Sequence, residues 1–179
     1  MKRRSGIQIM GKLIGLIRPL MHVMAAAIVL GVTGYLCAIF LTVLAGAGIL
    51  QVMGIWKGTT LLTLFVSLAV LAVLRGILHY GEQACNHYIA FKLLALIRHK
   101  VFAVLRKLCP AKLDGRDKGN LISIITTDIE LLEVFYAHTI SPIAIAFLTS
   151  LIMEIFFFRY HVLIGLFAIV GYLAIGVLM

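Results

Sequence analysis

Long apolar runs separated by short polar segments dominate the chain. Residues 19–56 contain no Asp, Glu, Lys or Arg, and a second apolar run covers residues 59–74. Two further uncharged runs follow at residues 134–153 and 162–179. A helix needs about 20 mostly apolar residues to cross a bilayer. The pattern therefore predicts an all-α membrane protein with spans near residues 20–50, 60–88, 134–158 and 162–179.

The first apolar run is longer than one span, so it should also contain a loop. Gly46, Gly48 and Gly54, with Trp56 beside them, place the helix end and an interfacial loop near residues 50–59. Before this run, residues 1–18 mix basic residues with apolar ones at intervals of three or four. This spacing is typical of an amphipathic helix that lies on the membrane surface. We expect an elbow helix there, with a disordered basic leader as the alternative.

The second run continues beyond the membrane as a helical pattern. An apolar stripe persists from Leu93 to Leu108 and no proline occurs before Pro110, so residues 60–108 predict one helix of roughly 70 Å. Only about 30 Å fits in hydrocarbon, so the remainder should project into water. Residues 121–158 predict a second, antiparallel arm, joined to the first by a polar tip at residues 109–120. The second arm is shorter than the first. The two lengths would agree better if the first helix ended before residue 108.

Composition and charge support this interpretation. The chain of 179 residues is 63% hydrophobic and 13% charged, which excludes soluble enzyme folds. Of its 16 Lys and Arg, five lie in residues 1–18 and nine in residues 75–118. The positive-inside rule then predicts a cytoplasmic N-terminus and a cytoplasmic helical hairpin. The last apolar run has no polar flank, so we expect a chain cut inside a larger protein.

The region around the polar tip resembles the membrane domain of ABC exporters. Residues 97–142 match the family's pattern at Arg98, Val101, Phe102, Leu105, Leu108, Gly119, Leu121, Ser123, Asp128, Leu132 and Glu133. Residues 81–98, with the pair Ser141 and Pro142, are most similar to the branch linked to cytochrome bd biogenesis and thiol export. The resemblance covers the whole chain, as an elbow helix (residues 1–18) and a partial membrane domain (residues 19–179) with an incomplete fourth span.

The resemblance implies a coupling role for the tip. In such exporters this segment docks on a nucleotide-binding domain, on the same or a separate chain, and two half-transporters pair as homo- or heterodimers. The residues that would dock are Leu113, Asp114, Gly115, Arg116 and Asp117, an apolar anchor within a rim of mixed charge. An ordinary solvated turn is the alternative.

No P-loop occurs in this chain, so ATP and Mg²⁺ would act only through a nucleotide-binding domain that is absent here. Whether the chain counts as part of an enzyme therefore depends on that domain. We expect no cofactor in the chain itself.

Polar residues gather on the second predicted helix where it should leave the membrane. His79, Gln83 and His87 share a helical face, with Glu82 adjacent to it and Arg75 deeper in the span. Ionisable residues at membrane depth usually face water or a bundle interior, so these five residues are candidates for a substrate pathway. Ordinary polar contacts between helices, including a bond from Glu82 to Asn86, and snorkelling of Arg75 are the alternatives. Glu154 would reach headgroup water or pair with a cation.

Other chemistry has little support. The six His have no HExxH spacing, and Cys37, Cys85 and Cys109 lie far apart, so no metal site is expected and haem is a minor alternative. The positive-inside rule already explains the basic residues from Lys92 to Lys107, because Lys and Arg keep a segment on the cytoplasmic side of the membrane. We expect no nucleic-acid partner.

Taken with the resemblance, the sequence predicts the permease part of an ATP-driven exporter in a bacterial plasma membrane. The alternative is a truncated four-span protein that acts as an assembly or regulatory partner without transport activity. The substrate and the direction of transport stay open.

Overall fold

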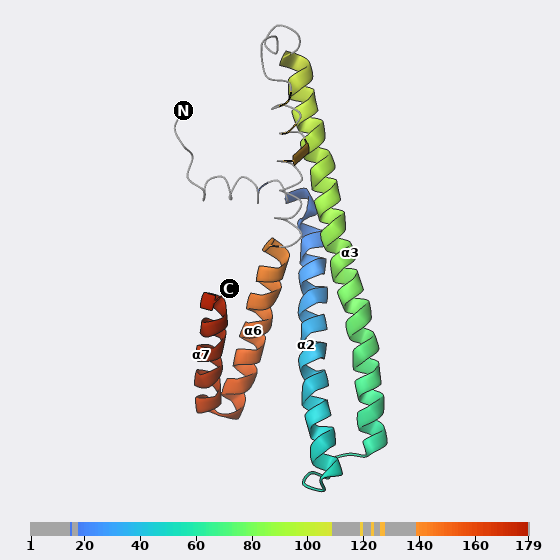
Figure 1. The fold of residues 1–179 in the computed structure, drawn as a ribbon, viewed down its shortest axis with the longest axis vertical. Coiled ribbons are helices and arrows are strands. Elements are labelled where there is room, and N and C mark those ends of the chain that lie inside the picture. Colours follow the sequence, from blue (N-terminus) through green and yellow to red (C-terminus); the bar gives the residue numbers. More distant parts are fainter. Residues whose placement is uncertain are drawn as a thin grey trace. The chain divides into compact units, whose positions relative to one another are not determined.

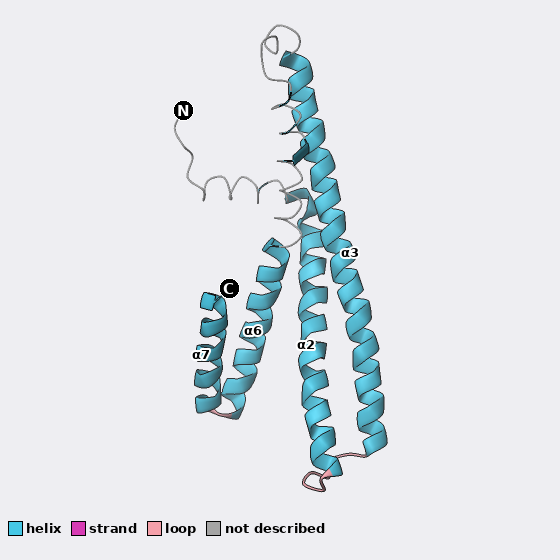
Figure 2. Ribbon diagram, viewed as in Figure 1, coloured by secondary structure: helices cyan, strands magenta, loops and turns pink. Residues whose placement is uncertain are grey.

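The structure, a computed structural model, describes Gly15, residues 18–108, Gly119, Ser123, and residues 126–127 and 139–178. Every regular element in this part of the chain is helical (Figure 2). The short 3-10 helix η1 (Arg18–Leu20) precedes the helices α2 (Met21–Val52), α3 (Leu61–Leu108), α6 (Ser141–Tyr160) and α7 (Val162–Leu178) (Figure 1). The prediction of an all-α chain is confirmed.

Three helical stretches of the described residues are long and apolar enough to cross a membrane. They are Arg18–Val52, Leu61–Lys107 and Ser141–Tyr160, and Val162–Gly176 is apolar but shorter. Most large hydrophobic side chains on these stretches are exposed, as on Phe65, Val73 and Phe167. Such a surface is compatible with lipid and would be an aggregation hazard in water.

The turn between α2 and α3 is built from residues suited to reversing the chain. Gly54 has φ +75°, a backbone conformation that favours glycine after a helix, and its N–H donates to the Gln51 carbonyl over 3.0 Å. At the start of α3, Thr60 Oγ1 accepts a hydrogen bond from the Thr63 N–H over 3.2 Å. This is an N-cap, and it explains why α3 begins at Leu61. The loop lies where the glycines and Trp56 predicted it.

Helix α3 has 48 residues and runs without interruption through Gly76 and Gly81. At about 1.5 Å per residue it is roughly 72 Å long, more than twice the hydrocarbon thickness. The suggestion that this helix ends before residue 108 is wrong. Ile89, Ala90 and Leu93 are buried, so packing supports the helix in its middle part.

Several predicted features lie outside the described residues. They are the elbow helix at residues 1–18 apart from Gly15 and Arg18, the tip at residues 109–120 apart from Gly119, and most of residues 121–138. Within the described part, α6 begins at Ser141, and residues 139–140 before it have π-helical hydrogen bonding.

The chain divides into two compact units, and α2 and α3 contribute to both. The first unit comprises Met1–Ala27 and Gly81–Ser141, and the second comprises Ile28–Tyr80 and Pro142–Met179. The described buried residues of the first unit are Leu20, Met24, Ala27, Glu82, Asn86, Ile89, Ala90, Leu93 and Ser141.

Helices of the second unit pack through small residues and aromatic rings. A Cβ on Gly34 of α2 would lie 3.5 Å from the Leu78 Cβ of α3, so the two helices approach closely here. The rings of Phe40 on α2 and Phe156 on α6 form an edge-to-face pair with centroids 6.2 Å apart. Small residues permit close contact between helices in lipid, where the hydrophobic effect does not hold them together.

Helices α6 and α7 form a hairpin that turns at His161. His161 Nδ1 accepts a hydrogen bond from the Leu163 N–H over 3.2 Å and so caps α7. The Phe158 ring covers Gly165, where any Cβ would come within 2.8 Å of a ring carbon. A glycine at this position therefore lets the hairpin close.

Candidate functional site

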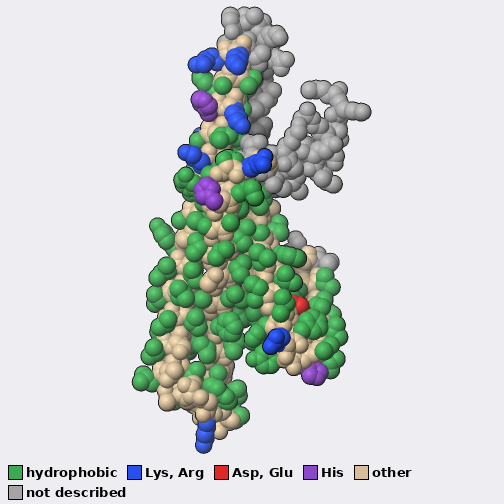
Figure 3. Space-filling view, turned by 180° about the vertical axis from the view of Figure 1, so that it is seen from behind, with side chains coloured by type: hydrophobic (Ala, Val, Ile, Leu, Met, Phe, Trp, Pro, Cys, Tyr) green, Lys and Arg blue, Asp and Glu red, His purple; other side chains and the backbone are tan. Residues whose placement is uncertain are grey.

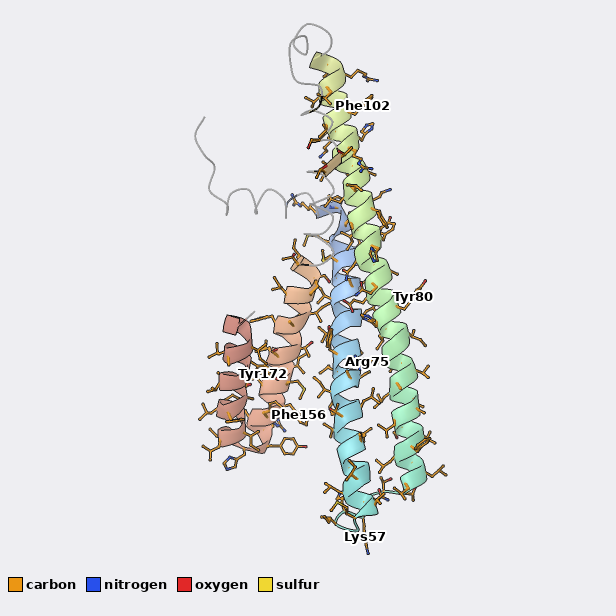
Figure 4. The ribbon with its side chains drawn as sticks, in the orientation of Figure 1. Lys57, Arg75, Tyr80, Phe102, Phe156 and Tyr172 are labelled. Atoms are coloured by element: carbon orange, nitrogen blue, oxygen red, sulfur yellow. The ribbon has the colours of Figure 1, made fainter. Side chains whose placement is uncertain are left out.

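The candidate pathway residues occupy two different faces of α3. Four-residue spacing places His79, Gln83 and His87 on one face, where both histidines are exposed and Gln83 is half-buried. Arg75 is exposed in the apolar first half of the helix (Figure 4). Glu82 is only 5% exposed. The structure therefore separates Glu82 from the exposed histidines.

The five residues are also divided between the two units. Arg75 and His79 lie in the second unit, and Glu82, Gln83 and His87 lie in the first. His87 stacks on Phe91, with ring centroids 6.0 Å apart and an interplanar angle of 22°. The aromatic neighbour restricts the imidazole while leaving it exposed.

Glu82 and Asn86 form the polar centre of the buried face of α3. Asn86 is 2% exposed, and its Nδ2 donates to Glu82 Oε1 over 3.5 Å, a long hydrogen bond. The contact follows from the four-residue spacing, and it agrees with the simpler interpretation that the two residues bond along the helix. Their neighbours on this face are apolar.

Glu154 on α6 is a polar site whose surroundings the sequence did not predict. Both carboxylate oxygens are buried and have no hydrogen-bond partner among the described residues. Tyr172 on α7, labelled in Figure 4, lies within electrostatic range of this carboxylate. Glu154 is therefore a buried carboxylate on α6 in this structure. No local pattern indicated this, because the position of Tyr172 depends on how α7 folds back.

Basic side chains concentrate on the second half of α3. Lys92, Arg98, Lys100, Arg106 and Lys107 are all exposed there, and Figure 3 shows Lys and Arg gathered on this part of the helix. By contrast, Arg75 is the only Lys or Arg between Leu61 and Phe91. The coupling residues predicted at 113–117 lie outside the residues that the structure describes.

An apolar groove lies between the ends of α2 and α3 that meet at the turn. It has a volume of about 480 Å³ and is lined by Ala45, Gly48, Ile49, Val52, Met53, Leu61, Leu64, Phe65 and Leu68. Its lining offers no polar side chain to orient a ligand, unlike a typical small-molecule site.

Within the described residues, no group of three or more His, Cys, Asp and Glu is placed to hold a metal. Cys37 and Cys85 are free thiols.

Long apolar helices, one of which extends far beyond bilayer thickness and carries basic residues at one end, define an integral membrane protein. Comparison with known proteins identifies the family to which this membrane protein belongs. The chain is 47% identical over 177 residues to a probable ABC transporter ATP-binding/permease protein of Haemophilus influenzae. The match covers 99% of the chain. The chain belongs to the ABC transporter family, as a partial membrane domain of the exporter type.

Two more distant relatives lie in the branch that the sequence resembles. They are the glutathione/L-cysteine transport system ATP-binding/permease proteins CydC of Escherichia coli, 30% identical over 84 residues, and of Haemophilus influenzae, 27% identical over 85 residues. These matches cover 47% and 48% of the chain and 15% of each relative. The chain spans about a third (32%) of the length of the first relative. A comparison with protein-family models found no match.

Proposed function

We propose that the chain is the permease part of an ATP-driven exporter and transmits the movement of a nucleotide-binding domain to a substrate pathway. The observation that carries the proposal is α3, whose 48 residues are too many for a bilayer crossing alone. A continuous helix is stiff along its length, so the part beyond the membrane can act as a lever. The similarity of 99% of the chain to part of an ATP-binding/permease protein supports this role.

The membrane is proposed to be a bacterial plasma membrane, with the N-terminus and the basic half of α3 in the cytoplasm. The distribution of Lys and Arg supports this orientation, because only Lys57 and Arg159 lie outside residues 1–18 and 75–118. Lys57 lies in the turn between α2 and α3 (Figure 4). That turn would then face the periplasm.

The coupling contact is proposed to lie at residues Leu113, Asp114, Gly115, Arg116 and Asp117. Their combination of an apolar anchor with charges of both signs suits a specific protein surface. The partner is a nucleotide-binding domain, in the same chain or another, and the complete transporter contains two such membrane domains. ATP and Mg²⁺ bind in that partner domain.

The substrate pathway is proposed to pass the exposed residues Arg75, His79 and His87 and the half-buried Gln83, with Glu82 behind them. Exposed ionisable side chains within or next to an apolar span support this, because in lipid they are costly unless they face water or a partner. Because two relatives are described as glutathione/L-cysteine transporters, small thiols are the first substrates to test.

The test uses the complete transporter in inverted membrane vesicles, with ATP and radiolabelled glutathione or cysteine outside. We expect ATP-dependent accumulation inside the vesicles. Reversing the charges at Asp114, Arg116 and Asp117 should abolish accumulation while the protein still hydrolyses ATP, because motion would no longer reach the membrane domain.

The matched control reverses the charge of Lys100, which is exposed on α3 away from the tip. This variant should accumulate substrate like the wild type. Coupled transport that survives the triple reversal would remove the coupling assignment. No accumulation of any substrate by the wild-type transporter would argue against export.

A further inference from the structure

The apolar groove at the turn between α2 and α3 is open and hollow. Its volume is about 480 Å³, and every residue that lines it is apolar. On its walls Phe65 is 76% exposed and Val52 is 74% exposed, so the groove is open to its surroundings. Gly48 leaves room inside it, because a Cβ there would meet nothing within 4 Å. Such a groove can take a hydrocarbon chain but has no group to orient a polar ligand.

The groove lies at the depth of one leaflet of the membrane. Along α3 its lining extends from Leu61 to Leu68, roughly 10 Å of helix. Leu61 and Tyr80 are 19 residues apart, roughly 29 Å, which is close to the hydrocarbon thickness of a bilayer. Trp56 precedes this stretch and the exposed Tyr80 ends it (Figure 4), and both residue types concentrate at membrane interfaces. The groove therefore begins at one interface and ends within the adjacent leaflet.

Lys57 supplies a positive charge at the interfacial end of the groove. It is the only Asp, Glu, Lys or Arg in residues 19–74. It lies in the turn between Met53 and Leu61, which both line the groove, and its side chain is exposed (Figure 4). Four residues of chain separate Lys57 from each of them, so its Cα lies at most about 14 Å from theirs.

Backbone bonding and ring packing hold Lys57 beside the groove. The Trp56 N–H donates to the Leu50 carbonyl over 3.2 Å. The Trp56 ring lies against Gly58, where any Cβ would collide with it. Ile49, which lines the groove, also lines a neighbouring hollow together with Trp56. The indole is therefore next to the groove, and Lys57 lies between two residues that contact each other.

No described carboxylate is placed to neutralise Lys57. The described acidic residues are Glu82 and Glu154. Glu82 lies 21 residues beyond Leu61 on α3, roughly 32 Å along the helix. Both carboxylate oxygens of Glu154 are buried and have no hydrogen-bond partner among the described residues. An anion for Lys57 must come from outside this part of the chain, and anionic lipid headgroups attract lysine at a membrane surface.

We propose that the groove binds one acyl chain of an anionic phospholipid whose phosphate is held by Lys57. The site presents an apolar groove, then an interfacial indole, then an ammonium group. A phospholipid has the matching order of acyl chain, ester region and phosphate. An apolar helix could cover the groove, but it would leave the ammonium group without an anion. The site shares no residue with the proposed substrate pathway, and it does not depend on export.

Photolabelling of the complete transporter in nanodiscs tests the site. The discs contain phosphatidylethanolamine and a small fraction of phosphatidylglycerol with a photoreactive diazirine in the middle of one acyl chain. We expect the label on groove residues of α2 and α3, mapped by mass spectrometry of peptides. Gly48→Leu fills the groove without a clash and should lower this labelling at least fivefold. The matched control is Gly171→Leu, because Gly171 on α7 is equally open but does not line the groove.

Variants of Lys57 test the headgroup contact. Lys57→Gln should lower labelling about fivefold, the factor that one lysine near an anionic membrane surface provides. Lys57→Arg keeps the charge and should retain the labelling. A phosphatidylcholine probe with the same diazirine should label the wild type more weakly, because its headgroup carries no net charge.

Contrary results are equally clear. Equal labelling of the wild type and Gly48→Leu would mean that the label comes from bulk lipid, which would overturn the site. A wild-type groove without label would mean that another helix covers it, with the same consequence. Equal labelling by the two probes, or no loss in Lys57→Gln, would overturn the phosphate contact. Lys57 is exposed, so its variants decide the proposal even if Gly48→Leu does not fold.

Discussion

At the scale of single residues, Gly34 determines how closely α2 approaches α3. The position where its Cβ would lie is 3.5 Å from Leu78 Cβ and 4.0 Å from the His79 backbone nitrogen. One added carbon fits at ordinary contact distance, and a longer side chain does not. The sequence shows a glycine here but does not indicate which of the glycines of α2 faces another helix.

Gly34→Leu should lower the thermal unfolding midpoint of the purified protein in detergent. Overpacking at a helix contact costs about 1–3 kcal/mol. Gly34→Ala should be neutral or slightly stabilising, since alanine favours a helix. The matched control is Gly46→Leu, because nothing lies within 4 Å of a Cβ at Gly46. Equal effects of leucine at both positions would contradict the close approach.

The ring pair Phe40 and Phe156 joins two helices that are far apart in the sequence. In a double-mutant cycle with Phe40→Leu and Phe156→Leu, we expect a coupling energy of about 0.5–1 kcal/mol, because the edge-to-face geometry adds to simple apolar contact. The measurement is chemical unfolding in mixed micelles. Strict additivity of the two substitutions would show that the rings do not interact.

At the scale of elements, α3 is the feature that sequence predicted most closely. Hydrophobic periodicity and the absence of proline are local properties, so residues 60–108 were predicted and Leu61–Leu108 is found. The environment of the candidate site on this helix was predicted only in part. Periodicity placed His79, Gln83 and His87 on one face, but it could not tell that Glu82 and Asn86 are buried.

Breaking α3 outside the membrane should separate ATP hydrolysis from transport. Ala95 is exposed, so Ala95→Pro removes no side-chain packing but costs about 3 kcal/mol of helix stability. We expect membrane insertion and ATP hydrolysis to persist while vesicle accumulation of substrate falls at least tenfold. Ala95→Ser is the control and should transport normally. Wild-type transport by Ala95→Pro would argue against a rigid lever.

At the scale of the whole molecule, the distribution of charge predicts an orientation that labelling can test. In a background without native cysteines, Lys57→Cys should react with an impermeant maleimide in spheroplasts, where only the periplasmic face is exposed. Lys100→Cys should react only in inverted vesicles. Both side chains are exposed in the structure, so access depends on the membrane. The reverse labelling pattern would invert the proposed topology.

The sequence by itself determined that the protein is helical, belongs in a membrane and resembles the ABC exporters. These properties depend on composition, periodicity and local motifs, which neighbours in the chain already specify. The tertiary structure alone decided that Glu82, Asn86 and Ser141 are buried, and that both carboxylate oxygens of Glu154 are buried. Burial depends on which helix packs against which, and the uniformly apolar surface of a membrane helix carries little information about its neighbours.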